Sequence, residues 1–127
     1  MSNQSFTILE SAARVADVSS VQDNLVGRGI LIVVDVTADP ASAAVTPKIR
    51  VRDENGDYNE VYWTADAAIS ATGEFSYLIF PTGLATGSKE LDVTETVNAP
   101  LPREWQLFMD HADADSITYS VRGHYIS

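Results

Sequence analysis

The sequence predicts an all-β protein, either an antiparallel β-sandwich or a jelly-roll-like barrel, with about seven to eight strands. Apolar residues recur with a period of two along most of the chain, which is the pattern of half-buried strands. Turn signals rich in Gly, Pro, Asn and Asp separate these segments at short intervals. No long segment carries the helical period of 3.6 residues.

The chain has 127 residues, which is close to the commonest domain size, so we expect a single β domain over residues 1–127. The absence of cysteine excludes disulfides, thiolate metal ligands and cysteine nucleophiles. The longest apolar run, Ile30 to Val34, is too short to span a bilayer. Residues Met1 to Ser5 lack the features of a signal peptide, so we expect synthesis in the cytoplasm.

The charge balance narrows the range of partners. The formal net charge is −10, from 18 acidic and 8 basic residues. Nucleic acids and anionic membranes are bound by clustered Lys and Arg, so the composition disfavours both as partners. The acidity instead indicates solubility or a fit to a basic protein surface.

Residues 1–12 have two interpretations, an N-terminal arm or an edge strand. The segment Ser2 to Leu9 is uncharged and polar apart from Phe6, Ile8 and Leu9, which are the candidate contacts to a capsid or to another subunit. As an arm, it would order on binding a partner. As a strand, Phe6 to Ala12 would open the sandwich. For Ala13 to Asn24 we expect a loop or a single helical turn, with Asp17 or Ser20 as its cap.

The middle of the chain predicts a central strand followed by a hairpin. Ile30 to Val36 is apolar on both faces for most of its length, which favours a strand covered on both sides. Val45 to Arg52 and Tyr58 to Thr64 flank the strongest turn in the sequence, Asp53 to Asp57.

The register of this hairpin follows from the loop length. A three-residue loop over residues 54–56 places Gly56 in the left-handed conformation and sets Ile49 opposite Val61 and Arg50 opposite Glu60. A two-residue Asn-Gly loop would instead set Ile49 opposite Tyr62 and Arg50 opposite Val61. We favour the three-residue loop, because it matches apolar with apolar residues and joins opposite charges.

Three further strands are expected, at Glu74 to Phe80, Arg103 to Asp110 and Ser116 to Ile126. Between the first two, Lys89 to Pro102 is a long polar connection with at most a short strand or turn at Leu91 to Val93. The faces of the strands predict a core centred on these residues: Ile32, Val34, Ile49, Val61, Ile79, Trp105, Leu107, Ile117 and Tyr119.

No catalytic or metal-binding residues are expected. His111 and His124 stand without a nucleophile elbow or further zinc ligands, so they are interpreted as rim histidines. The acidic tip Asp53, Glu54, Asn55 and Asp57 departs from the EF-hand pattern, because the glycine comes one position early and Thr64 stands where the bidentate Glu belongs.

Three other features favour structural explanations. Asp110, Asp113 and Asp115 fit a turn stabilised by Asp side chains. Gly87, Ser88 and Lys89 have the wrong order for a phosphate-binding loop. Core packing explains most of the aromatic residues that could line a carbohydrate groove, namely Tyr58, Tyr62, Trp63, Phe75, Tyr77, Phe80 and Trp105.

Three segments of the sequence resemble those of a known group of proteins. They are Gly29 to Thr37, Pro100 to Trp105 and Asp113 to Val121. Over roughly Ala13 to Ile126 the chain resembles small virion structural proteins of tailed bacteriophages, the capsid decoration or cement proteins among them.

The resemblance implies a structural protein, not an enzyme, that binds the lattice of the major capsid protein and stabilises the head. It implies no catalytic residues, no cofactor and no metal. It also implies a location on the capsid surface of the virion and a homo-oligomer, which by analogy is a trimer. The alternative is a tail, head–tail junction or fibre component, with or without a carbohydrate-binding sandwich.

Overall fold

The computed structural model describes residues 5–24, 27–38, 42–81 and 93–126. Over these residues the chain is all-β without helix, and its strands form two sheets. The strands are β1 (Ser5–Arg14), β2 (Val18–Asp23), β3 (Gly29–Ala38), β4 (Val45–Val51), β5 (Glu60–Thr64), β6 (Gly73–Ile79), β7 (Glu95–Val97), β8 (Glu104–His111) and β9 (Ile117–Ile126).

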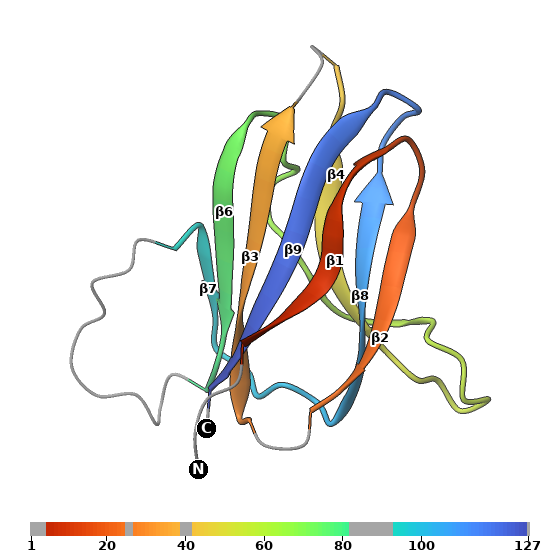
Figure 1. Ribbon diagram of the computed structural model, residues 1–127. Coiled ribbons are helices and arrows are strands. Elements are labelled where there is room, and N and C mark those ends of the chain that lie inside the picture. Colours follow the sequence, from red (N-terminus) through yellow and green to blue (C-terminus); the bar gives the residue numbers. More distant parts are fainter. Residues whose placement is uncertain (1–4, 25–26, 39–41, 82–92, 127) are drawn as a thin grey trace.

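The two sheets pack face to face as a β-sandwich, not as a closed barrel (Figure 1). The five-stranded sheet has the order β1-β9-β3-β6-β7, and the four-stranded sheet has the order β2-β8-β4-β5. All pairings are antiparallel except that of β7, which runs parallel to β6. The predicted fold class is therefore confirmed in its sandwich form, with four strands at sheet edges: β1, β7, β2 and β5.

The core lies between the inward faces of β8 and β4 in one sheet and of β9, β3 and β6 in the other. Trp105, Leu107 and Met109 alternate inward from β8 and are fully buried. Every expected core residue is buried except Val61, which is 53% exposed. The inward residue of the return strand is Trp63, so the prediction for Val61 was wrong.

The hairpin explains that error. Its loop is the predicted one, because Gly56 has a φ of 86° and its N–H donates to the Asp53 carbonyl, while the Asp53 N–H donates to the Asp57 carbonyl. The strands, however, pair Arg50 with Val61 and Ile49 with Trp63, so neither register predicted for Ile49 is correct.

Two irregularities in the return strand shift the pairing. The Asn59 N–H turns back to the Asp57 carbonyl, so β5 begins at Glu60 instead of Tyr58. A β-bulge then leaves Tyr62 without a partner in β4, between the pair Arg50–Val61 and the pair Ile49–Trp63. The extra residue breaks the alternation of faces within β5, so that Trp63 points inward and Val61 outward.

The N-terminal third contains more strand than expected. Phe6 to Ala12 is indeed a strand, within β1, but half of Ala13 to Asn24 is the edge strand β2 and not a loop or helical turn. The sequence of β2 hides its period, because the inward position Ser20 is polar, as is Gln22.

The remaining expectations hold in outline. The strand at Ile30 to Val36 is central, between β9 and β6. Its outer side chains Leu31 and Val33 are only partly buried, so the expected cover on both faces is incomplete. The short strand of the long connection is β7, whereas most of the predicted position Leu91 to Val93 and all of Gly87 to Lys89 lie outside the described residues.

Candidate functional site

The segment that carries Phe6, Ile8 and Leu9 is part of the fold. Ile8 is 8% exposed and belongs to the core, and Phe6 and Leu9 pack against it. The Phe6 ring stacks on Tyr125 with 4.8 Å between ring centroids. It also covers Gly123, where a Cβ would lie 2.9 Å from the ring. Residues 2–4 of the proposed arm lie outside the described residues.

Strand β1 pairs with β9 along one side, and no other strand of the described residues pairs with its second side, which is therefore a free sheet edge. The second half of this edge is partly occupied by Arg14, whose guanidinium donates to the carbonyls of Glu10 and Ala12 and, at 2.6 Å, to that of Tyr119. Register shifts between Thr7 and Ala12 also distort the strand. Bulges and charged side chains are common protections of edge strands, and here they leave Ser5 to Thr7 as the more regular part of the edge.

One end of the sandwich is closed by a polar cluster around His111. Its Nε2 lies 2.9 Å from the Tyr119 hydroxyl, which joins the two sheets, and its backbone N–H donates to Asp17 Oδ1 at 2.7 Å. The Arg14 guanidinium lies 4.6 Å from the centroid of the Tyr119 ring. Burial lowers the pKa of His111 and raises that of Tyr119 to about 12. The cluster holds the β1–β2 turn against β8, and it contains no activated nucleophile.

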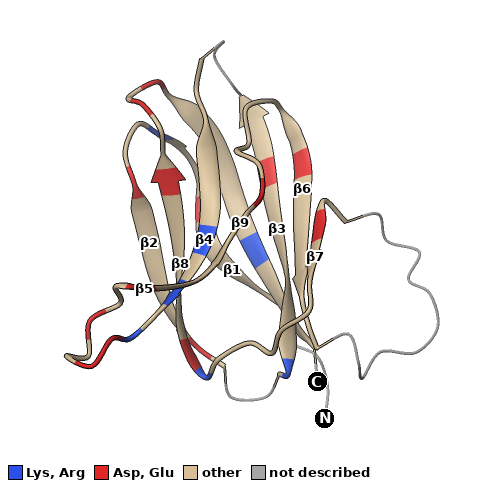
Figure 2. Ribbon diagram, turned by 180° about the vertical axis from the view of Figure 1, so that it is seen from behind, with Lys and Arg blue, Asp and Glu red and all other residues tan. Residues whose placement is uncertain are grey.

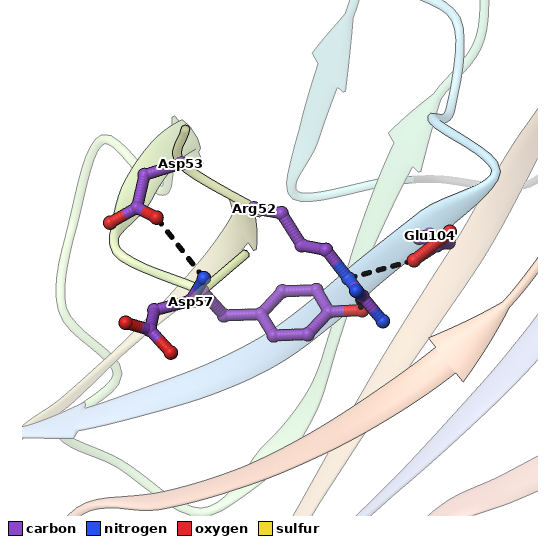
Figure 3. Close-up of polar contacts among 5 residues, drawn as sticks. Arg52, Asp53, Asp57 and Glu104 are labelled. Carbon is purple, nitrogen blue, oxygen red and sulfur yellow. Dashed lines mark hydrogen bonds and ion pairs between the residues drawn. The ribbon is translucent and has the colours of Figure 1, made fainter. Parts of the chain in front are cut away.

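The acidic hairpin tip is an internally bonded turn. The carboxylate of Asp53 accepts hydrogen bonds from the N–H groups of Asn55 and Asp57 and from the Asn59 side chain. The backbone bond from Asp57 and the side-chain bond from Asn59 are the main causes that lower the pKa of Asp53. Figure 3 shows this carboxylate directed at the backbone of Asp57 and away from the Arg52–Glu104 pair. The oxygens of Asp53 therefore stabilise the turn, as expected of a solvated tip.

The second acidic turn follows the same pattern. The Asp115 N–H donates to Asp113 Oδ1 at 3.1 Å, and Asp115 also accepts a hydrogen bond from Ser42. Among the residues described, no group of three or more His, Asp or Glu side chains is arranged to hold a metal ion.

The aromatic residues considered for a carbohydrate groove mostly serve the core. Trp63, Tyr77 and Trp105 are buried, and Trp63 and Tyr77 pack together with ring centroids 5.3 Å apart. A sugar ring stacks on an exposed aromatic face, so these three residues cannot form such a platform. Tyr62 is exposed at the bulge, where its hydroxyl donates to the Pro100 carbonyl.

Two structural side chains escaped the sequence analysis. Asn24 is buried and links the start of β3 to the connection before β8. Glu95 of β7 accepts hydrogen bonds from Trp63 Nε1 at 2.8 Å and from the Asp66 N–H at 2.9 Å, which ties the edges of the two sheets together. A lone Asn or Glu in a polar segment gives no sequence signal for such a role.

The outer face of the four-stranded sheet concentrates cations of this acidic chain. Lys48, Arg50 and Arg52 follow each other along β4 and its end, where blue marks the basic residues in Figure 2. Lys48 pairs with Asp110 at 2.9 Å, and Arg52 pairs with Glu104 at 2.7 Å. A hydrogen bond to Tyr58 and the charge of Glu104 raise the pKa of Arg52. Arg50 contacts Gln106 and Phe108, and no carboxylate of the described residues forms an ion pair with it.

The described part of the chain includes no helix that could cross a membrane. Comparisons with protein-family models, with curated proteins and with solved structures found no match. The candidate sites therefore rest on the geometry of this chain alone: the free edge of β1, the His111 cluster and the outer face of the four-stranded sheet.

Proposed function

We propose that the chain is a structural protein of a tailed-bacteriophage virion, a capsid decoration protein that binds the lattice of the major capsid protein and stabilises the head. On this proposal it acts by protein–protein contact, without catalysis, cofactor or metal. Its place is the outer surface of the capsid, and it assembles there as a homo-oligomer.

The observation that carries this proposal is the free edge of β1. An exposed edge strand presents unpaired backbone N–H and C=O groups, and a partner chain can add a strand to them. Phe6 and Ile8 fix the first half of β1 to the core, so its free side is held ready for such pairing. A preformed edge loses less conformational entropy on binding than a loose arm would.

The three sequence segments that resemble phage virion proteins also support the proposal. Gly29 to Thr37 lies in β3, Pro100 to Trp105 leads into β8, and Asp113 to Val121 covers the final turn and half of β9. These segments build the core of the sandwich. The resemblance therefore concerns a scaffold for binding and not a chemical site.

The proposal is tested by cosedimentation of the purified chain with empty capsids of the phage that encodes it, followed by electron microscopy of the decorated particles. We expect saturable binding and regular added density on the outside of the head. Density confined to the tail or to the head–tail junction would replace decoration with the alternative role, and absence from the virion would refute both.

The role of the β1 edge is tested by Thr7→Lys, with Thr96→Lys as the matched control. Thr7 is exposed on β1, and Thr96 is exposed on β7, the opposite edge of the same sheet. A lysine on an edge strand opposes strand addition. We expect the Thr7 variant to lose capsid binding and the Thr96 variant to keep it. The Thr7 variant should also melt at a slightly lower temperature, because it loses the hydroxyl that accepts a hydrogen bond from Arg122 and places a second cation opposite Arg122. Equal binding by the two variants would exclude β1 as the contact.

A further inference from the structure

A single row of side chains crosses the outer face of the four-stranded sheet. Val21 of β2 pairs with Gln106 of β8, Gln106 pairs with Arg50 of β4, and Arg50 pairs with Val61 of β5. Directly paired residues point to the same face of a sheet, so these four side chains form one line. Val21 and Val61, at the two ends, are each 53% exposed. The row thus has apolar ends and a polar centre.

The charged residues beside this row include three cations, two of which form ion pairs, and Asp23 of β2, which is paired in register with Glu104. On β4 and β8, Lys48 is neutralised by Asp110 and Arg52 by Glu104. Arg50 instead faces Gln106, an uncharged amide, and among the residues described it has no carboxylate partner. Arg50 is therefore the cation of this face that lacks an ion pair, and it lies between the two exposed valines.

Arg50 is also held in place. Its Nε donates to Gln106 Oε1 at 3.0 Å, and its Cζ lies 3.9 Å from the centroid of the Phe108 ring. These two contacts draw the guanidinium from β4 toward β8, beside the middle of the row, because Phe108 lies two residues along β8 from Gln106. Because Nε is engaged by Gln106, the terminal Nη groups are the donors that remain to receive a carboxylate, and a planar guanidinium can hold one in bidentate fashion.

We infer that this face is a docking site for an extended segment of a partner protein. In this segment an acidic residue is flanked by two aliphatic residues, one two positions before it and one two positions after it. The carboxylate binds Arg50, and the aliphatic side chains cover Val21 and Val61. The surface lies on the other sheet from β1, so the inference does not depend on the proposed contact with a capsid.

The spacing of the row supports this occupant. Val21 and Val61 are three strand spacings apart, which is about 14 Å. In an extended segment, side chains on one face recur at every second residue, and the first and fifth residues lie about 13–14 Å apart. The third residue then falls at the centre of the row, where Arg50 and Gln106 meet. A five-residue stretch of the form aliphatic-any-acidic-any-aliphatic fits the row without bending.

A second copy of this chain fits less well. Two copies packed face to face about a two-fold axis over the row would bring both Arg50 side chains together without a carboxylate from the row itself. The row itself thus offers no carboxylate to the Arg50 of a second copy, whereas a foreign acidic segment does.

The inference is tested with two blocked pentapeptides, Val-Ser-Glu-Ser-Val and the matched Val-Ser-Gln-Ser-Val, titrated into the isotope-labelled full chain and followed by nuclear magnetic resonance. We expect the Glu peptide to shift the Arg50 Nε–H and Gln106 side-chain signals, with saturation below about 10 mM, and the Gln peptide to bind about tenfold more weakly. Equal shifts with both peptides, or no shift at these signals, would overturn the inference.

Variants of the chain separate this face from a general charge effect. Arg50→Gln removes the proposed contact, and Arg122→Gln removes one positive charge from the outer face of the other sheet. We expect only the Arg50 variant to lose the preference for the Glu peptide. Val61→Ser, at an exposed site, keeps the charge and should weaken both peptides. The inference would be refuted if only the Arg122 variant lost binding. It would also be refuted if the Arg50 signals shifted with protein concentration in the absence of peptide, because a second copy of the chain would then be the occupant.

Discussion

Asn24 provides the sharpest test of how this sandwich is closed. Its side-chain oxygen accepts the Gly27 N–H at 2.8 Å, and its Nδ2 donates to the carbonyls of Gly27 at 2.7 Å and Leu101 at 3.2 Å. The residue is 7% exposed, so water cannot fully replace these bonds. Asn24→Ala removes all three hydrogen bonds. The Leu101 carbonyl then loses a donor at a buried position.

The expected cost is about 2–4 kcal/mol, at about 1 kcal/mol for each hydrogen bond plus the desolvation of a buried group left unpaired. A domain of this kind has about 5–15 kcal/mol of stability, so the variant should still fold but unfold at a clearly lower urea concentration. Asn24→Asp should be nearly as damaging, because its carboxylate keeps the bond from Gly27 N–H but faces two carbonyl oxygens.

The assay is equilibrium unfolding in urea, with Asn59→Ala as the control. Asn59 makes an exposed hydrogen bond to Asp53, so its loss should cost less than about 0.5 kcal/mol. A cost below about 0.5 kcal/mol for Asn24→Ala as well would refute the assigned role of Asn24, since a buried amide with three partners cannot be removed so cheaply.

Three further outcomes are expected. Leu107→Ala should cost about 2–5 kcal/mol in chemical denaturation, because Leu107 is fully buried, and a loss below about 1 kcal/mol would contradict the assigned face of β8. The pKa of His111 is lowered in the folded chain from a value near 6.5 in the unfolded chain, so the unfolded chain binds more protons between these two pKa values. The free energy of unfolding should therefore fall as the pH drops below 6.5 and level off below the folded pKa. His111→Gln should remove this part of the pH profile, measured by urea unfolding. An excess of chelator should leave the melting temperature unchanged, whereas a drop of several degrees would point to a cation at the Asp53 tip or at the Asp110 to Asp115 turn.

The sequence alone was sufficient for the fold class and for most of the core. Alternation such as that of Trp105, Leu107 and Met109 identifies both a strand and its inward face, because burial demands apolar side chains at every second position. The loop with Gly56 was also predictable, since few residues other than glycine adopt a positive φ.

Tertiary structure decided what depends on contacts between distant segments. The backward turn at Asn59 shifted the pairing before Val61, and the bulge at Tyr62 then left Val61 outward and Trp63 inward. The packing of Trp63 against Tyr77 and its hydrogen bond to Glu95 hold the return strand from the other sheet. Strand β2 exists because β8 offers it an edge, although its own pattern is weak.

The candidate surfaces divide in the same way. Phe6, Ile8 and Leu9 stand out in the sequence as isolated anchors, but only the structure shows that they fix β1 to the core and leave its edge free. The row from Val21 to Val61 has no sequence signature, since its four members come from four strands. Local periodicity specifies which side of a strand faces the core, whereas the pairing of strands that are far apart in sequence determines which outward side chains become neighbours.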